Sequence, residues 1–173
     1  MTQQDSTNKI GRTFTWITWI IGLCLVAFVF DELLDYQYNP NQSVASDTSS
    51  NGKVSVKLQQ NRMGHYVLNG EINQQSVTFL LDTGATSVSI PAQVADNLNL
   101  QTKGSYLVNT ANGTVKVYRT VLSTLRIGEI TLYNVAANIN PAMKSDEILL
   151  GMSALRQVEF SQIGDQLIIR EQR

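Results

Sequence analysis

The part of the sequence with the clearest capacity for chemistry is an aspartate that ends an apolar run. Residues 77–81 read VTFLL, and Asp82, Thr83 and Gly84 follow directly. A carboxylate at the mouth of a buried strand is costly unless it is hydrogen-bonded or paired. Thr83 and Thr86 offer hydroxyl groups, and Gly84 lets the backbone turn tightly and approach a partner. Asp82 is therefore the candidate catalytic residue, and the alternative is a strand that ends in a turn with Asp82 as its cap.

A second apolar segment ends in glycine later in the chain. Residues 148–152 read ILLGM. Both this segment and the run before Asp82 are apolar at consecutive positions, as strands buried on both faces require. The presence of two such strands favours a functional loop at Asp82 over a chance occurrence of Asp-Thr-Gly.

Several other kinds of site are disfavoured by composition. The chain has one cysteine, Cys24, and one histidine, His65. Neither an internal disulfide nor a cysteine-based metal site can form, no metal-ligand spacing is present, and we expect no metal and no cofactor. A Ser-His-Asp or Cys-His mechanism would need His65, which we expect on the surface at the start of a strand. The net charge is -1 and the basic residues are scattered, so nucleic acid is not an expected partner.

The N-terminal part contains a long apolar segment, and the predicted transmembrane helix covers residues 14–34. Residues 14–30 carry no charge, and as a helix they span about 26 Å, slightly less than a hydrocarbon core of roughly 30 Å. Inclusion of Leu33 and Leu34 closes this gap. A buried core helix would be apolar on every face, and a cleaved signal peptide would have a shorter run and a small-x-small site. The sequence favours an uncleaved signal anchor.

The charges on either side of this helix predict its orientation. Lys9 and Arg12 precede it, and three acidic residues follow between positions 31 and 35. The positive-inside rule then places residues 1–13 in the cytoplasm as a short tail, with the rest of the chain across the membrane. In a bacterium this is a single-pass inner-membrane protein with a periplasmic C-terminal domain. Residues 35–53 are rich in Ser, Asn, Gln and Asp and are expected to form a flexible linker.

The remaining residues, 54–173, show short alternating apolar runs separated by turn residues and predict one domain. Its tightest expected turn is Asn112-Gly113, a pair typical of a type I′ hairpin because both positions need positive φ. The fold class is all-β, with one or two short helices, after one transmembrane helix. The expected strands and hairpins cover residues 54–58, 65–72, 77–81, 88–90, 105–122, 130–139, 148–150 and 166–170, and the expected short helices cover 91–100 and 153–157.

The motifs FLLDTGAT and ILLGMS resemble those of retroviral-type (retropepsin-like) aspartic proteases, and specifically their membrane-anchored bacterial branch. The resemblance covers roughly residues 64–170 and also includes Gly64-His65 and the TANG sequence at 110–113. It implies a closed, barrel-like half of an aspartic protease. One departure is Ala154, where a bulkier apolar residue is expected, and this bears on packing rather than on the catalytic site.

The resemblance also implies a role for each matching segment. Asp82 would be the catalytic carboxylate, Thr83 would lock two loops together at a dimer axis, and Gly84 would bring backbone to the substrate. A hairpin tip would act as a flap over bound peptide, and an apolar strand would cross behind the catalytic loop. The loop is completed by Ala85 and Thr86, the flap tip is Ala111, Asn112 and Gly113, and the strand is Leu149, Leu150 and Gly151.

One Asp-Thr-Gly supplies only half of the two carboxylates that this chemistry needs. Two close carboxylates share one proton, so that the ionised one activates water and the protonated one polarises the peptide carbonyl. The sequence therefore predicts a homodimer in which two Asp82 residues meet and which hydrolyses a peptide or protein substrate. Asp146 and Glu147 were considered as second carboxylates, but a solvated loop is the expected place for both.

Two other functions stay open at this point. The first is a non-catalytic domain of the same fold that binds peptides or scaffolds a membrane complex, although the intact motif at Asp82 argues against it. The second is an unrelated β domain that serves as an interaction module, which requires both glycine-ended apolar strands to be coincidental.

Overall fold

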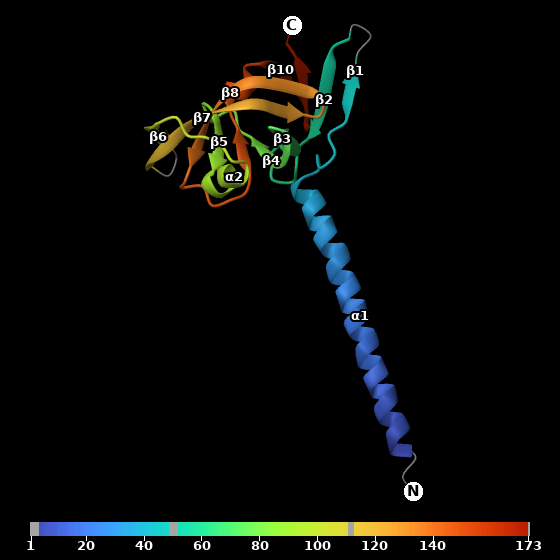
Figure 1. Cartoon of the computed structure of the whole chain (residues 1–173). Helices are drawn as coiled ribbons and strands as arrows, with labels where there is room; N and C mark the ends of the chain where they lie inside the picture. The colour runs from blue at the N-terminus through green and yellow to red at the C-terminus, as the bar shows by residue number, and fades with distance from the viewer. Residues whose placement is uncertain (1–3, 49–51, 111–112, 173) are drawn as a thin grey trace. The chain divides into compact units, whose positions relative to one another are not determined.

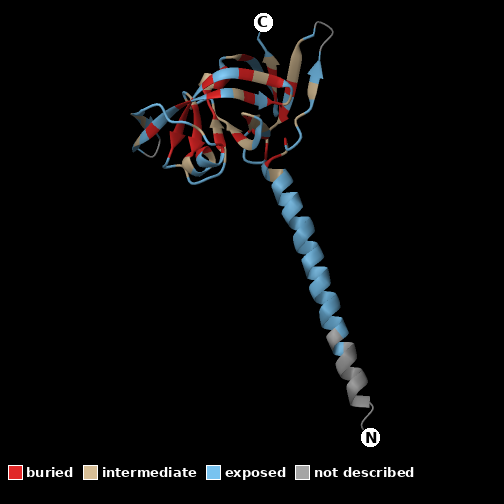
Figure 2. Ribbon diagram, viewed as in Figure 1, coloured by how far each residue is buried: buried red, intermediate tan, exposed pale blue. Residues whose placement is uncertain are grey.

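The computed structural model describes residues 4–48, 52–110 and 113–172 (Figure 1). The chain divides into two compact units, residues 1–37 and 38–173. Helix α1 (Gln4–Tyr38) makes up the first unit. Its segment Phe14–Tyr38 contains an 18-residue window with a mean hydropathy of 2.1 and no buried residue, so it is long and apolar enough to cross a membrane. Figure 2 shows the contrast with the second unit, in which buried residues are concentrated.

The second unit is built mainly of strands, which form two sheets. The larger sheet has the strand order β3-β4-β9-β5-β8-β7-β6, and an additional pairing of β3 with β7 closes most of it into a barrel-like ring. Its strands are β3 (Val67–Ile72), β4 (Gln75–Leu81), β5 (Val88–Pro91), β6 (Ser105–Thr110), β7 (Gly113–Ile127), β8 (Ile130–Asn140) and β9 (Ile148–Leu150).

The smaller sheet is antiparallel and has the order β1-β2-β11-β10. Its strands are β1 (Ser46–Thr48), β2 (Val54–Gln59), β10 (Val158–Ile163) and β11 (Gln166–Glu171), and the two short helices of the unit are α2 (Ala92–Asn97) and α3 (Met152–Leu155). One apolar core joins both sheets, because Phe79 and Leu150 of the larger sheet belong to the same buried cluster as Val56 and Ile169 of the smaller one.

The long β7–β8 hairpin contributes to the core with different faces at its two ends. In β8, Ile130 and Leu132 are buried near the start, whereas Val135 and Ala137 are buried further along. Even positions therefore face the core before residue 134 and odd positions after it. Asn134, with φ 52°, lies where the change occurs. Asparagine adopts this left-handed conformation more readily than most residues, so it allows the strand to exchange faces.

The expected strands are confirmed, with differences at some boundaries. The predicted hairpin over residues 105–122 is longer, because β7 continues to Ile127. Of its predicted tip, Ala111 and Asn112 lie outside the described residues, and Gly113 begins β7 with φ 106°. The predicted helix over 91–100 is the shorter α2, since Pro91 still pairs in β5.

Part of the expected linker belongs to the domain instead. We call residues 38–42 the strap. Asn39 and Asn41 within it are 7% and 5% exposed, and Asn41 bridges to Leu68 of β3. Residues 46–48 form β1 and pair with β2. The polar composition suggested a flexible segment, but asparagine amides can satisfy backbone groups of neighbouring strands, and a segment held in this way is ordered.

Candidate active site

The predicted site residues 82–86 lie in the loop between β4 and β5, residues 82–87, which we call the catalytic loop after its predicted role. Asp82 is half-buried, and its backbone N–H donates to the carbonyl of Leu150 at 3.2 Å. The N–H of Gly84 donates to Oδ1 of Asp82 at 2.8 Å, and the N–H of Ala85 donates to the carbonyl of Asp82 at 3.2 Å. The loop thus folds back on its own carboxylate. Hydrogen bonds of this kind hold a carboxylate in one orientation.

Strand β9 lies between the two strands that this loop connects. It pairs in parallel with β4, through Leu80 and Leu149, and contacts β5 on its other side, through Ser89 and Leu149. The loop therefore joins β4 to β5 across the end of the strand that lies between them. Because both neighbours of β9 flank this loop, the two apolar runs of the sequence meet at the candidate site.

The close packing of the catalytic loop on β9 requires a glycine at position 151, directly after the strand. A Cβ on Gly151 would lie 2.4 Å from the carbonyl oxygen of Ser87 and 2.7 Å from that of Ala85, both of them backbone atoms of the catalytic loop. The N–H of Met152 donates to the carbonyl of Ala85 at 2.8 Å. A side chain at position 151 would push the loop away from β9, so Gly151 sets how closely they pack.

Two polar side chains, Ser153 and Asn138, hold the far end of the loop through hydrogen bonds that the sequence analysis did not identify. Ser153 Oγ accepts from the N–H of Val88 at 2.9 Å and donates to the carbonyl of Ala136 at 2.6 Å. Asn138 donates from Nδ2 to Ser87 Oγ, and its Oδ1 accepts from Ser89 Oγ, both at 2.8 Å. Asn138 and Ser89 are both buried.

The sequence carries only half of the signal for this cluster. Ser87 and Ser89 alternate with Val88 and Ile90, which indicates two hydroxyl groups on one face of the strand after the motif. Their partner, Asn138, is identified only by the register of β5 against β8, in which Ser89 lies opposite Asn138.

The other predicted site residues lie around this centre. Thr83, Gly84 and Thr86 are exposed and Ala85 is half-buried. The predicted flap residues Ala111 and Asn112 lie outside the described residues. The two strands of that hairpin, β6 and β7, are paired from Ser105 opposite Tyr118 to Thr110 opposite Gly113. Thr114 Oγ1 donates to Asn109 Oδ1 at 2.9 Å. Leu107 on β6 is 69% exposed, so this hairpin presents an apolar side chain to solvent.

The acidic residues considered as a second carboxylate are placed differently. Asp146 is exposed, and Glu147 accepts a hydrogen bond at Oε1 from the hydroxyl of Tyr38 at 2.6 Å. Glu147 is therefore engaged by the strap. Among the described residues, no three His, Cys, Asp or Glu side chains are grouped to hold a metal ion. His65 is exposed just before β3, as expected.

Tyr66, next to His65, lies beside the end of β4, the strand that precedes Asp82. Its carbonyl accepts from the N–H of Leu81 at 3.0 Å. Its hydroxyl is buried and has no hydrogen-bond partner among the described residues. Burial, followed by the charge of Asp165, raises the pKa of Tyr66. The side chain therefore stays neutral even where an exposed tyrosine begins to ionise, and it packs in the apolar core as an uncharged group.

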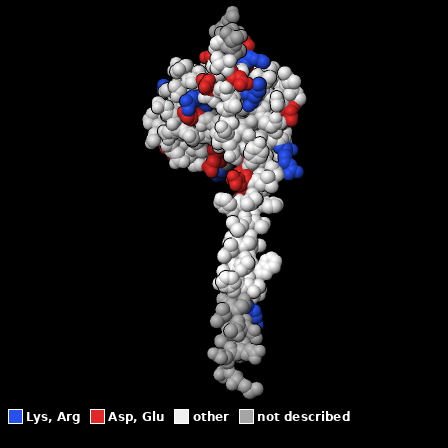
Figure 3. Space-filling model, turned by 90° about the vertical axis from the view of Figure 1, so that its right-hand side faces the viewer, with Lys and Arg blue, Asp and Glu red and all other residues white. Residues whose placement is uncertain are grey.

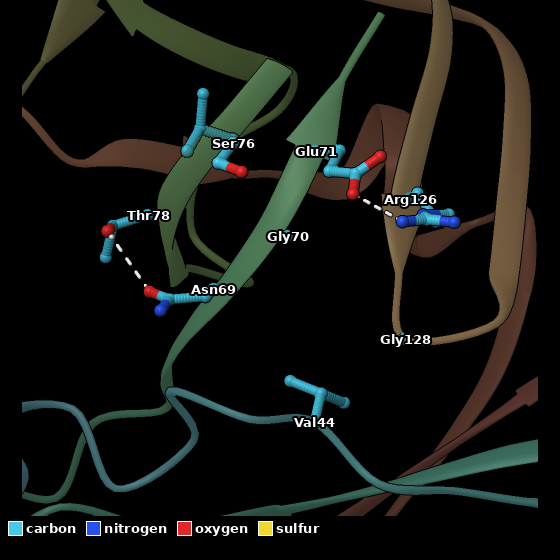
Figure 4. Close-up of a pocket in the computed structure, with 9 residues that line it drawn as sticks. Val44, Asn69, Gly70, Glu71, Ser76, Thr78, Arg126 and Gly128 are labelled. Carbon is cyan, nitrogen blue, oxygen red and sulfur yellow. Dashed lines mark hydrogen bonds and ion pairs between the residues drawn. The ribbon is translucent and has the colours of Figure 1, made fainter. Parts of the chain in front are cut away.

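A surface pocket of about 350 Å³ lies at the other end of β4 (Figure 4). Across it, Glu71 and Arg126 form an ion pair, and Thr78 donates to Asn69 at 3.3 Å. None of the residues of the catalytic loop lines the pocket. It is therefore separate from the candidate active site.

The charges of the domain are distributed without a dominant sign. On the face drawn in Figure 3, basic and acidic side chains intermingle. The ion pairs Lys57–Asp47 and Arg126–Glu71 join opposite charges on neighbouring strands.

In this closed β domain an Asp-Thr-Gly loop follows one strand and packs on a second, buried strand that a glycine follows. This arrangement defines the class of aspartic proteases. Residues 68–157, just over half of the chain, match the family described as "gag-polyprotein putative aspartyl protease". The chain belongs to this family, and its fold is retropepsin-like.

The chain is also similar to individual proteins. A crystal structure of a retropepsin-like aspartic protease from Rickettsia conorii is 26% identical, with a TM-score of 0.56, and the match covers 75% of this chain and 95% of that one. An uncharacterized Sinorhizobium protein from the cobV 5′ region is 31% identical over 72% of this chain and 55% of its own length. An uncharacterized Rickettsia prowazekii protein is 30% identical over 61% of this chain and 46% of its own. The chain spans about half the length of these two curated relatives.

Proposed function

We propose that this chain is a membrane-anchored aspartic endopeptidase that acts as a homodimer. The observation that carries the proposal is the catalytic loop itself. In it the backbone N–H of Gly84 donates to Oδ1 of Asp82 at 2.8 Å, and the loop packs on β9 and on Gly151, which follows that strand. The carboxylate is only half-buried, so it is accessible to a second carboxylate and to water.

The second carboxylate in this proposal is Asp82 of another copy. Asp146 is exposed and Glu147 bonds to Tyr38, so the two carboxylates weighed as partners within the chain have other surroundings. A two-fold axis beside the catalytic loop brings two identical carboxylates together. Confinement to a membrane by α1 favours this association because it raises the effective concentration of the copies.

The mechanism follows from the chemistry of two close carboxylates. Repulsion between them keeps one proton on the pair, and the two titrations belong to the pair rather than to either Asp82. The ionised carboxylate accepts a proton from water, which attacks the peptide carbonyl, and the protonated carboxylate donates a hydrogen bond to the carbonyl oxygen. The β6–β7 hairpin would close over the bound peptide.

The proposed location is a bacterial inner membrane crossed once by α1, with the protease domain in the periplasm. The support is the apolar segment of α1, with Arg12 before it and Asp31 after it. This arrangement follows the positive-inside rule.

Cleavage of a mixed peptide library by the full-length protein in detergent, at several pH values, tests the proposed activity. We expect wild type to cut and Asp82→Asn to lose between about a hundredfold and ten thousandfold in rate, the range for loss of a general acid–base group. Asp146→Asn is the matched control, because it makes the same chemical change at an exposed site. If wild type is folded and dimeric but cuts nothing, a peptide-binding or scaffolding domain of the same fold becomes the better account.

A further inference from the structure

The strap, residues 38–42, is bound to the domain by side chains whose hydrogen bonds are directed at backbone. Asn41 Nδ2 donates to the carbonyls of Gln59 at 2.9 Å and Val67 at 2.7 Å, and its Oδ1 accepts from the N–H of Gln59 at 2.7 Å. The carbonyl of Asn41 accepts from the N–H of Asn69 at 3.2 Å. One buried residue of the strap thus joins β2 to β3.

The strap begins at the last residue of helix α1. Asn61 Nδ2 donates to the carbonyl of Tyr38 at 2.9 Å, and the Tyr38 hydroxyl donates to Glu147 at 2.6 Å. Asn39, the next residue, is buried and donates to Asn69 Oδ1 at 2.9 Å. The residue at which the helix ends is therefore itself bonded to the domain, with no flexible linker after it. A flexible linker over residues 35–53 would instead reach roughly 60 Å when extended.

The same contacts limit how far the catalytic residue lies from the end of the helix. Asn61 bonds both to Tyr38 and to the N–H of His65 at 3.0 Å, and the next residue, Tyr66, accepts the N–H of Leu81, which precedes Asp82. The lengths of these hydrogen bonds and of the backbone segments between them add up to about 25 Å. The distance from Tyr38 to Asp82 therefore cannot exceed this value. The bound follows from connectivity and holds for any angle of the helix.

The helix adds little to this distance. The apolar run ends at Leu34, and the four residues from Asp35 to Tyr38 add about 6 Å of helix. If α1 spans a bilayer, Asp82 then lies within about 30 Å of the hydrocarbon boundary. A domain on a flexible linker could reach segments much farther from the membrane.

We propose that this protease has a fixed reach, so that among membrane-anchored polypeptides it selects those with an extended segment within about 30 Å of the bilayer. The proposal rests on the proposed function, because it assumes both the anchor and the peptidase activity. The strap supplies the new element, which is a fixed reach. A scissile bond held farther away cannot reach Asp82, and a freely diffusing peptide is cut without this selection.

Reporter proteins in liposomes test the reach of the full-length enzyme. Each reporter has one membrane helix that continues as a rigid helical spacer of about 15 Å or about 75 Å, and both carry the same cleavable sequence at the end of the spacer. We expect wild type to cut the near reporter at least about tenfold faster than the far one. A soluble peptide with the same sequence reports the activity itself.

Two insertion variants provide the matched comparison. A Gly/Ser segment of about 30 residues between Gln37 and Tyr38 leaves the strap bound and lengthens the reach, so we expect the preference for the near reporter to fall below about threefold. The same segment added after Arg173 should leave the preference unchanged.

The outcomes separate the inference from the function on which it rests. Equal cleavage of both reporters by wild type, with the soluble peptide also cut, overturns the fixed reach and leaves the peptidase in place. Failure to cut the peptide and both reporters overturns the peptidase, and the substrate proposal with it.

A measurement that needs no activity tests the reach directly. A dye at Lys144→Cys, an exposed position, is introduced with Cys24→Ser into the Asp82→Asn protein, and an acceptor dye is placed on the lipid. We expect strong energy transfer that decreases when the segment is inserted between Gln37 and Tyr38. Transfer that is weak from the start, or that the insertion leaves unchanged, contradicts the fixed reach.

Discussion

The catalytic loop and the strap are both short polar segments held by hydrogen bonds between side chains and backbone, but they place their polar groups differently. The loop leaves the Asp82 carboxylate half-buried, with Oδ1 held by the N–H of Gly84. The strap buries Asn39 and Asn41 almost completely and uses all the amide atoms of Asn41 on backbone. The comparison teaches that the same kind of contact can hold a group ready for chemistry in one place and join two strands in another.

The largest expected loss of stability comes from the packing of the loop on β9. Gly151→Ala places a Cβ 2.4 Å from a backbone carbonyl oxygen, and backbone cannot move aside without displacing the loop. We expect the free energy of unfolding to fall by about 3 kcal/mol or more, because overpacking at backbone is costly. Urea unfolding followed by circular dichroism measures it.

Gly104→Ala is the control for this substitution. A Cβ there meets nothing within 4 Å, although its φ of 80° makes a side chain strained by about 1 kcal/mol. Equal losses for both variants would mean that the close approach of loop and strand is not what position 151 requires.

Substitutions in the strap should change the free energy of unfolding and not the cleavage rate. Asn41→Ala leaves the N–H and carbonyl of Gln59 and the carbonyl of Val67 without their partner, and we expect a loss of about 3 kcal/mol. Gln42→Ala, at an exposed neighbour, should change the free energy of unfolding by less than about 0.5 kcal/mol. The cleavage rate per folded molecule in detergent should stay within about twofold of wild type. A large loss of that rate would remove the distinction between the two segments.

A smaller effect is expected at the far end of the loop. Asn138→Leu removes the amide partner of the half-buried Ser87 hydroxyl and of the buried Ser89 hydroxyl, which keeps only its weak 3.4 Å bond to Met143 Sδ. We expect a cost of about 2 kcal/mol in the free energy of unfolding. Replacement of both serines by alanine in the same protein should recover most of this loss, because no polar group is then left unsatisfied. If the triple variant is no more stable than Asn138→Leu, the cluster does not act as one hydrogen-bonded unit.

The sequence predicted what depends on local pattern and on the matching motifs. Alternation located the strands, and the apolar runs before Asp82 and Gly151 indicated the two strands that meet at the site. The composition of the strap predicts a linker, because polar composition alone does not distinguish an asparagine that binds water from one that binds a neighbouring strand. Asn138 was missed for a related reason, since its partners are set by the register of β5 against β8.

The central claim is that each active site contains two Asp82 carboxylates from two copies, and mixed dimers test it most directly. Wild type and Asp82→Asn are allowed to exchange subunits in equal amounts at constant total protein. Because only dimers with two wild-type copies are then active, the account predicts about one quarter of the activity of pure wild type. Independent monomers, or sites that need one Asp82, would retain about half or more, and that result would contradict the shared site.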